Sequence, residues 1–223
     1  MRPSTIAGRA EHVRLLIAAA CLRSGRSPEG VTLIAVTKGF PPDVIREAVA
    51  AGIQDIGENR VQEAAAKRPA LADLPAGVTW HMIGHLQTNK VKTALTVFDI
   101  IHSVDSLQIA EAISRQAPGP VPAFLEVNVA GEPTKSGFSL DDLPRAYEAV
   151  ARLPNLDIRG LMTVAPLAGV AQEARPAFRR LHQEAQALGL QQLSMGMSDD
   201  FEAAIEEGAT HVRIGRAIFG ERE

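Results

Sequence analysis

Lys38 is the residue whose position first points to chemistry. It ends the apolar run LIAVT and is followed by Gly39 and two prolines, so a lysine stands where a buried strand gives way to a helix. The apolar flank would bury the lysine stem and hold the amine at the strand end. Desolvation, or a nearby cation such as Arg60 or Arg213, lowers the pKa of such an amine and makes it a nucleophile for carbonyl groups. A solvated surface lysine is the alternative.

Two C-terminal segments have the composition of a phosphate site. SMGMSDD places Gly196 and Ser198 directly before a predicted helix, whose backbone N–H groups attract anions. VRIGRAIFG ends a predicted strand at Gly215, where a ligand can approach the backbone closely. Each feature alone is equally a helix cap or a tight turn. Beside Lys38, the two together favour a phosphate site.

Arg213 is the third element of this group. It lies two residues before Gly215, so strand alternation places both on one side. A guanidinium stays protonated, and facing a pyridine nitrogen it would keep that nitrogen unprotonated. The alternative is a salt bridge to one of the 26 acidic residues. Pyridoxal phosphate (PLP) held by Lys38, and a Schiff-base aldolase acting on a phosphorylated sugar, both fit these residues.

Eight strand candidates alternate with helical patterns along the chain. This alternation predicts a single (β/α)8 TIM barrel, as one domain over residues 1–223, with an extra N-terminal helix at 10–22. An open doubly wound sheet is the alternative, but no G-x-G-x-x-G turn follows the first strand. The predicted strands are 31–38, 55–59, 79–84, 100–105, 123–130, 158–165, 192–198 and 211–220.

Helix signals separate these strands. PPDVIREAVAAG opens with proline and acid and closes at Gly52, while Ser106, Ser139 and Ser198 are predicted to begin helices. Segment 166–176 is predicted to be an irregular loop at the barrel mouth. Chemistry in such barrels gathers at the carboxyl ends of the strands. The polar side chains expected there are Lys38, Glu58, Asn59, Arg60, His81, His85, Ser103, Asp105, Asn128, Thr163, Ser198 and Arg213.

The composition excludes several classes of protein. The 223 residues are 46% hydrophobic and 22% charged, with a net charge of −3 and no basic block, which argues against nucleic acid as a main partner. The single cysteine, Cys21, excludes an internal disulfide and is predicted to be a packed apolar residue in a reducing compartment. LLIAAACL is far below the ~20 residues of a membrane span. We therefore predict a cytoplasmic protein without membrane contact or a metal site.

The motifs in their order resemble the pyridoxal phosphate homeostasis protein family, which is related to the barrel domain of alanine racemase. The resemblance extends from about residue 10 to Gly220. It rests on AVTKGFP, DIGENRVQE, WHMIGHLQTNK, HSVDS, FLEVNVAGEPTKSGF, IRGLMTVAP and LSMGMSDDFEAAIEEGATHVRIGRAIFG.

The resemblance implies a barrel that holds PLP as an aldimine. Lys38 matches the Schiff-base lysine, and Arg213 matches the arginine that faces the pyridine nitrogen in racemase-like barrels. The matched cofactor-binding positions are Lys38, Asn59, Ser198, Arg213, Gly215 and Arg216. Of these, Ser198, Gly215 and Arg216 match phosphate-binding positions.

The resemblance also implies a non-catalytic PLP carrier in PLP homeostasis, which releases the cofactor to apo-enzymes. The alternative is an amino-acid racemase or another weak PLP enzyme. Racemisation needs an acid/base on each face of the cofactor. In alanine racemases a tyrosine of a C-terminal domain serves one face, whereas this sequence ends at Glu223 and its only tyrosine, Tyr147, lies in a predicted helix. His81 or His85 is the remaining candidate for a second base.

Two further expectations complete the prediction. The segment AGEPTKSGF contains Gly and Pro residues typical of turns and is predicted to be a loop. Its Lys135 either binds the aldehyde of PLP during transfer to an apo-enzyme or is a solvated loop lysine. Because the racemase dimer uses the C-terminal domain, we expect a monomer.

Overall fold

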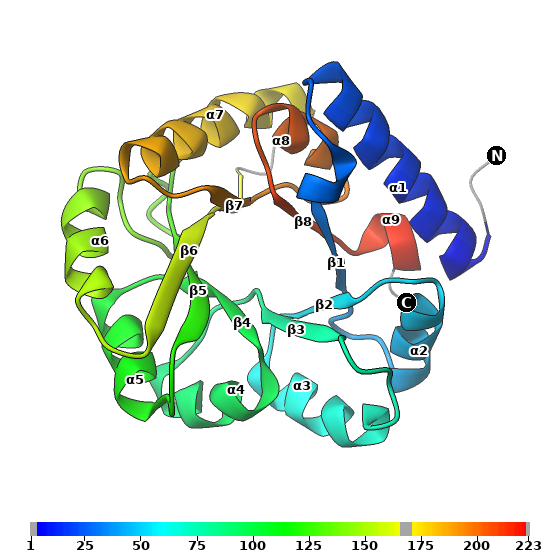
Figure 1. Cartoon of the computed structure of the whole chain (residues 1–223), viewed down its shortest axis with the longest axis horizontal. Coiled ribbons are helices and arrows are strands. Elements are labelled where there is room, and N and C mark those ends of the chain that lie inside the picture. The colour runs from blue at the N-terminus through cyan, green and yellow to red at the C-terminus, as the bar shows by residue number, and fades with distance from the viewer. Residues whose placement is uncertain (1–3, 166–170, 222–223) are drawn as a thin grey trace.

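The structure, a computed structural model, describes residues 4–165 and 171–221. Within these residues eight parallel strands close into a barrel in chain order, with β8 pairing back to β1, and helices surround it (Figure 1). This confirms the predicted TIM barrel. The strands are β1 (Thr32–Val36), β2 (Asp55–Glu58), β3 (Thr79–Met82), β4 (Ile100–Val104), β5 (Val121–Glu126), β6 (Leu156–Met162), β7 (Gln192–Ser194) and β8 (His211–Ile214).

The predicted N-terminal helix is present as α1 and packs against α2, α8 and α9, so it completes the outer ring. The hydroxyl of Thr5 caps its first turn by accepting the N–H of Gly8, and Cys21 is buried on its inner face, as predicted. The helices are α1 (Ile6–Arg23), α2 (Pro42–Ala50), α3 (Val61–Lys67), α4 (Val91–Val97), α5 (Leu107–Gln116), α6 (Leu143–Ala151), α7 (Ala171–Ala187), α8 (Phe201–Glu206) and α9 (Arg216–Phe219). Short 3-10 helices are η1 (Pro28–Gly30), η2 (Arg68–Leu71) and η3 (Thr88–Lys90).

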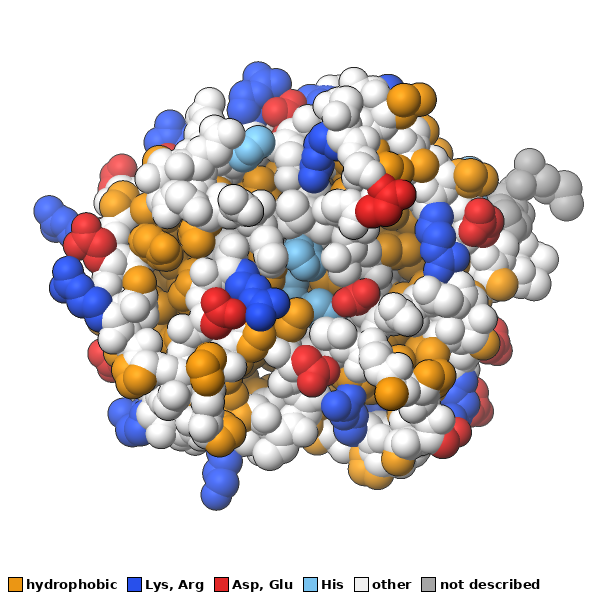
Figure 2. Space-filling view, in the orientation of Figure 1, with side chains coloured by type: hydrophobic (Ala, Val, Ile, Leu, Met, Phe, Trp, Pro, Cys, Tyr) orange, Lys and Arg blue, Asp and Glu red, His pale blue; other side chains and the backbone are white. Residues whose placement is uncertain are grey.

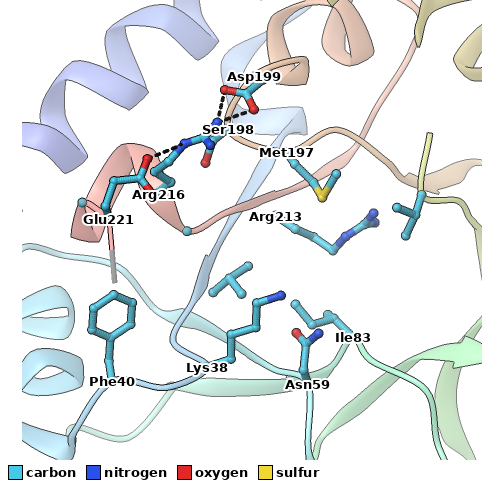
Figure 3. Close-up of a pocket in the computed structure, with 14 residues that line it drawn as sticks. Lys38, Phe40, Asn59, Ile83, Met197, Ser198, Asp199, Arg213, Arg216 and Glu221 are labelled. Atoms are coloured by element: carbon cyan, nitrogen blue, oxygen red, sulfur yellow. Dashed lines mark hydrogen bonds and ion pairs between the residues drawn. The ribbon is translucent and has the colours of Figure 1, made fainter. Parts of the chain in front are cut away.

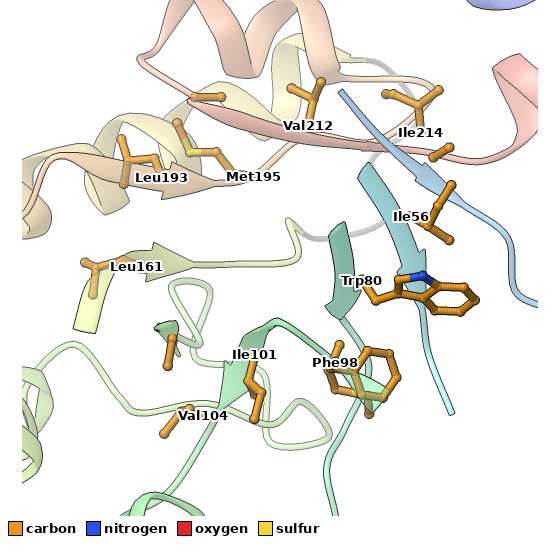
Figure 4. Close-up of a cluster of buried hydrophobic side chains, with 14 of the residues drawn as sticks. Ile56, Trp80, Phe98, Ile101, Val104, Leu161, Leu193, Met195, Val212 and Ile214 are labelled. Atoms are coloured by element: carbon orange, nitrogen blue, oxygen red, sulfur yellow. The ribbon is translucent and has the colours of Figure 1, made fainter. Parts of the chain in front are cut away.

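Two layers of side chains fill the molecule. Apolar residues such as Trp80, Ile101 and Leu193 form the layer between strands and helices (Figure 4). The barrel interior is partly polar, because it contains the imidazole ring of His102. This ring stacks on Phe124 with ring centroids 4.3 Å apart, and both residues are fully buried. Strand alternation sends successive residues to these two layers.

The last strand is shorter than the predicted 211–220. β8 ends at Ile214, and the amides of Ile218 and Phe219 bond back to the carbonyl of Gly215 at 3.0 and 2.9 Å. The chain therefore coils into α9, and the predicted strand is wrong over its second half. This turn places the first residues of α9 at the barrel mouth.

Two of the three predicted serine caps are also wrong. Ser106 caps α5 as predicted, but α6 begins after Asp142 and α8 after Asp200. The hydroxyl of Ser139 accepts the N–H of Asp142 and so forms the turn before the helix rather than its cap. A serine followed by acidic residues thus marked each helix start a few residues too early.

The predicted loop 166–176 is partly helical. Residues 166–170 lie outside the described ranges, and α7 begins at Ala171 and runs through Pro176. Phe178, Leu181 and Ala185 are buried along one face of α7. The burial of this apolar face outweighs the helix-breaking tendency of one proline near the helix start.

Candidate functional site

A cavity of about 460 Å³ lies at the carboxyl ends of the strands (Figure 3). Its wall contains all six residues predicted to bind a cofactor: Lys38, Asn59, Ser198, Arg213, Gly215 and Arg216. The remaining lining residues are Val36, Phe40, Ile83, Val164, Met197, Asp199, Gly220 and Glu221.

Lys38 comes from the turn that follows β1. The strand ends at Val36, Thr37 is fully buried, and Gly39 has a φ of 79°, the left-handed region that favours glycine. This turn directs the Lys38 side chain into the cavity, where it lies beside Asn59 and its amine points toward the part of the cavity that contains Arg213 (Figure 3).

A buried ion cluster holds the backbone on both sides of the pocket lysine. Lys67 Nζ from α3 donates to the carbonyl of Thr37 at 2.9 Å and pairs with Glu58 Oε1 at 2.6 Å and Glu63 Oε1 at 2.7 Å. Glu63 also accepts the N–H of Gly39 at 2.5 Å. Burial raises the pKa of Glu58, although Lys67 acts in the opposite direction. Sequence reasoning missed Lys67; its i,i+4 spacing from Glu63 was the available signal.

Asn59 is held by a close backbone approach. A Cβ at Gly84 would lie 2.4 Å from the carbonyl oxygen of Asn59. Only a glycine therefore fits at position 84, and the chain after β3 can press the Asn59 backbone against the cavity.

Ser198 and Arg216 meet at the outer end of the cavity. The Ser198 hydroxyl accepts the N–H of Ala217 in α9 at 3.2 Å. Arg216 pairs with both carboxylate oxygens of Asp199, and its Nε lies 3.4 Å from Glu221 (Figure 3). The residues predicted to bind an anion therefore come together where the loop after β7 meets the start of α9, not at the start of α8.

Arg213 crosses the inner side of the cavity. Its Nη1 donates to the carbonyl and hydroxyl of Ser194, both at 2.7 Å, and its Nη2 donates to the carbonyl of Thr163 at 2.8 Å. Burial lowers the pKa of Arg213 to about 10, while Glu126 and Asp200 act in the opposite direction. The guanidinium is therefore charged at neutral pH.

Several predicted mouth residues lie elsewhere. Glu58 and Ser103 are fully buried, and Arg60 is exposed at the start of α3 without lining the cavity. Asn128 bonds the backbone of its own loop at Glu132. Thr163 is buried, and its hydroxyl donates to the carbonyl of Val127 at 2.7 Å.

The two histidines proposed as second bases are separated. His81 is buried inside the barrel and contacts Asp55 and His102, so its predicted place at the mouth is wrong. His85 is exposed, and its Nδ1 lies 2.7 Å from Asp105 Oδ2. Neither histidine lines the cavity.

Near His85 and Asp105, Glu126 ends β5. Burial, with Asp105 adding to it, raises the pKa of Glu126 to about 7, although Arg213 and His85 act in the opposite direction. The carboxyl group therefore changes its protonation state near neutral pH. Sequence reasoning did not single out Glu126 within the predicted strand 123–130.

Lys135 and Tyr147 are placed by their own elements. Lys135 pairs with Glu132 at 2.7 Å and reaches the carbonyl of Ala165 at 3.3 Å. Tyr147 lies in α6, as predicted, and packs against the apolar layer.

Sequence reasoning also missed the apolar and acidic parts of the wall. Phe40, Ile83 and Met197 lie one or two residues from the polar residues that carried the prediction. Asp199 was not singled out, although it directly follows Ser198. The available signal for these residues was their place in the sequence, within two positions of a residue already predicted to lie at the barrel mouth.

Two classes of feature are not found in the described part of the chain. No group of three or more His, Cys, Asp or Glu residues there is arranged to hold a metal ion. Among the same residues, no helix is long and apolar enough to cross a membrane.

Sequence comparisons connect the chain to known proteins. The family model for the alanine racemase N-terminal domain matches residues 20–223. The pyridoxal phosphate homeostasis protein of Pseudomonas aeruginosa is 48% identical over 225 residues, covering 99% of this chain and 97% of that protein. The protein of the same name from Escherichia coli K12 is 42% identical over 229 residues, with 98% and 97% covered.

Solved structures agree with these matches. PipY of Synechococcus elongatus, solved with PLP bound, has a TM-score of 0.83 and 41% identity, covering 97% of this chain and 100% of that one. Alanine racemase from Corynebacterium glutamicum has a TM-score of 0.71 at 19% identity, covering 97% of this chain and 60% of that one. The second likeness concerns the fold alone.

Proposed function

This chain belongs to the pyridoxal phosphate homeostasis protein family, and on that premise we propose that it binds PLP in the cavity at Lys38 and acts as a non-catalytic carrier. The observation that carries the proposal is the meeting of three kinds of group in one cavity: the amine of Lys38, the hydroxyl of Ser198 with the exposed guanidinium of Arg216, and the buried guanidinium of Arg213. The PLP-bound structure of PipY supports it.

The side chains in the cavity fit the chemical groups of PLP. At the outer end, the hydroxyl of Ser198 and the guanidinium of Arg216 suit a phosphate, with Gly215 leaving the backbone accessible. At the inner end, Arg213 is a cation at neutral pH and suits an unprotonated pyridine nitrogen. Asn59 is the polar neighbour beside the lysine.

Bound PLP supplies an aldehyde carbon that a primary amine attacks. We assign that attack to Lys38, whose nitrogen forms a C=N bond to this carbon while water leaves. The reverse reaction with water restores both groups, so the linkage is reversible. The Lys67 cluster holds the backbone on both sides of Lys38 and keeps the amine directed into the cavity.

A carrier fits the surroundings better than a racemase. Racemisation needs a second acid/base on the opposite face of the cofactor. In the described part of the chain, His85 pairs with Asp105 outside the cavity wall, and Tyr147 lies in the outer helix α6. The recipients are apo forms of PLP-dependent enzymes, and we expect a cytoplasmic monomer whose single domain spans residues 1–223.

The test is borohydride reduction of PLP-loaded protein followed by peptide mapping. We expect a visible absorption band that reduction removes, with the label on Lys38. The Lys38→Ala variant should lose both signals, whereas Lys92→Ala, which changes an exposed lysine on α4, should keep them. A label on another lysine, or a colourless protein after addition of PLP, contradicts the proposal.

A second measurement separates carrier from enzyme. PLP-loaded protein is incubated with L-alanine, and the D-isomer is followed by chiral chromatography. We expect no turnover above that of Lys38→Ala; multiple turnovers that depend on Lys38 would make the protein a racemase. Transfer of PLP from Lys135→Ala to an apo-enzyme tests the hand-over role of that loop lysine.

A further inference from the structure

A line of polar side chains crosses the inside of the barrel and ends at Arg213. Asp55 Oδ1 lies 2.9 Å from His81 Nε2, and His81 Nδ1 lies 2.9 Å from His102 Nε2. His102 Nδ1 then lies 2.8 Å from Ser194 Oγ, which accepts from Arg213 Nη1 at 2.7 Å. The five residues come from β2, β3, β4, β7 and β8. The PLP-binding role proposed above makes no use of the first four.

The two ends of this line determine where its hydrogens lie. A carboxylate only accepts hydrogen bonds, so His81 carries a hydrogen on Nε2 and offers Nδ1 as an acceptor. His102 must then donate from Nε2 and accept at Nδ1. Ser194 donates its hydroxyl hydrogen to that nitrogen and presents a lone pair to Arg213, which only donates.

If the hydrogen bonds were donated in the opposite direction, from His81 toward Ser194, the buried hydroxyl hydrogen of Ser194 would be unpaired. If His81 or His102 donated from Nδ1, the hydroxyl of Ser194 would accept from both His102 and Arg213. Its own hydrogen would then have no acceptor among the described residues. An unpaired buried donor is costly, so a direction that runs from Arg213 to Asp55 is favoured.

The line is shielded along most of its length. His81, His102 and Ser194 are at most 1% exposed, and His102 is clamped by stacking on Phe124. Burial lowers the pKa of His102 well below its usual value, in keeping with a neutral ring. The Asp55 side chain is 28% exposed, at the start of β2 and so at the end of the barrel opposite the cavity. Figure 2 shows histidine side chains with an acidic side chain beside them at the centre of the ring of helices.

We propose that Asp55 is a positioning residue for Arg213. Its carboxylate fixes the ring tautomers of His81 and His102, so that Ser194 presents a lone pair to the guanidinium. Chains of hydrogen bonds polarise one another, so the charge of Asp55 also acts on Arg213 through the line. The effect on PLP rests on the proposed function, whereas the tautomers belong to the cofactor-free protein.

The first test is nitrogen NMR of ¹⁵N-histidine-labelled, cofactor-free protein at neutral pH. We expect His81 and His102 each to carry one hydrogen, on Nε2. Asp55→Asn should keep both tautomers, because the amide oxygen still accepts. Asp55→Ala removes one of the two ends that order the line, so it should bring in a measurable fraction of the Nδ1–H form. An Nδ1–H tautomer in the unmodified protein, or unchanged tautomers in Asp55→Ala, overturns the proposal. These readings stand whether or not the protein binds PLP.

The second test uses PLP-loaded protein. We expect Asp55→Ala to move the visible absorption band and to weaken PLP retention by about fivefold, at the low end of typical coupling between distant sites. Asp55→Asn should restore most of the retention. Asp157→Asn, which changes an exposed carboxylate at the start of β6, serves as the control and should change neither property. Equal effects of Asp55→Ala and Asp157→Asn overturn the proposed influence on Arg213.

Discussion

The two arginines of the cavity wall have opposite surroundings. Arg213, at the inner end, is 4% exposed and is held by uncharged oxygens of Ser194 and Thr163. Arg216, at the outer end, has a side chain that is 48% exposed and pairs with the carboxylates of Asp199 and Glu221.

The difference shows that burial sets the free-energy cost of exchanging the partners of a charged side chain. A buried guanidinium exchanges its partners only by leaving polar groups unpaired in the interior, whereas an exposed one exchanges carboxylates for water or phosphate at little cost. We infer that the inner arginine is a fixed part of the wall and the outer one an exchangeable contact. The carrier role proposed above, which requires release of PLP, would use both kinds of contact.

The largest expected effect tests whether burial alone makes a cation costly to remove. Lys67 is buried like Arg213 but pairs with carboxylates like Arg216. Lys67→Met leaves Glu58 as an uncompensated buried charge, so we expect the free energy of unfolding in urea to fall by about 3–5 kcal/mol. The double variant with Glu58→Gln should recover most of that loss. An exposed ion pair contributes about 1 kcal/mol or less. A fall in the free energy of unfolding below about 1 kcal/mol, measured by urea titration, would therefore show that the type of partner, not burial, decides the cost of removing the cation.

The next effect compares the two arginines directly. Arg213→Met leaves the hydroxyl oxygen of Ser194 and the carbonyl oxygen of Thr163 without a donor, and we expect a loss of about 2–3 kcal/mol in the free energy of unfolding. Arg216→Met removes only exposed pairs and should cost less than about 1 kcal/mol. Both are measured by chemical denaturation without PLP, and equal losses would remove the distinction between the two ends.

Glu126 supplies a pH-dependent test at the inner end. Its pKa rises from the ordinary 4.5 to about 7 in the folded protein, so the folded state binds more protons between these values. The free energy of unfolding therefore falls as pH rises through this window, and the loss is complete above it. Glu126→Gln removes the charge, so it should be more stable than the parent protein at pH 8 by about 1–3 kcal/mol and nearly equal at pH 4.

The control for this test is Glu148→Gln, which changes an exposed glutamate on α6. It should leave the stability difference between the two pH values unchanged. A Glu126→Gln protein whose stability follows the same pH curve as its parent would show that Glu126 stays charged in the fold.

The smallest effect is expected at the outer end. On the proposed binding mode, Asp199 would compete with the phosphate of PLP for Arg216. An exposed pair contributes up to about 1 kcal/mol, so Asp199→Asn should tighten PLP binding by about two- to fivefold. Glu202→Gln removes the same charge from α8, outside the cavity wall, and controls for net charge. Weaker binding by Asp199→Asn, measured by spectroscopic titration, would mean that Asp199 orients Arg216 rather than competing for it.

Local patterns predicted the elements well and their ends less well. All eight strands were predicted, because each is a short run of apolar and β-branched residues next to turn signals. The errors at Ser139, Ser198 and Gly215 have two causes. Ser139 and Gly215 accept hydrogen bonds from residues three or four positions further on, so the local pattern found a turn there but misplaced the element boundary. Ser198 accepts the N–H of Ala217 across 19 positions, a partner that no local pattern identifies.

By itself the sequence determined the barrel, the place of Lys38 just after β1 and six of the residues that meet in the cavity wall. Strand ends in a parallel barrel share one mouth, so position along the chain was enough. Only the tertiary structure decided which side chains meet inside the barrel. Ser194 bonds His102 across 92 positions, and Lys67 reaches Thr37 from the outer ring. Such contacts depend on register and closure of the whole sheet, which no local pattern encodes.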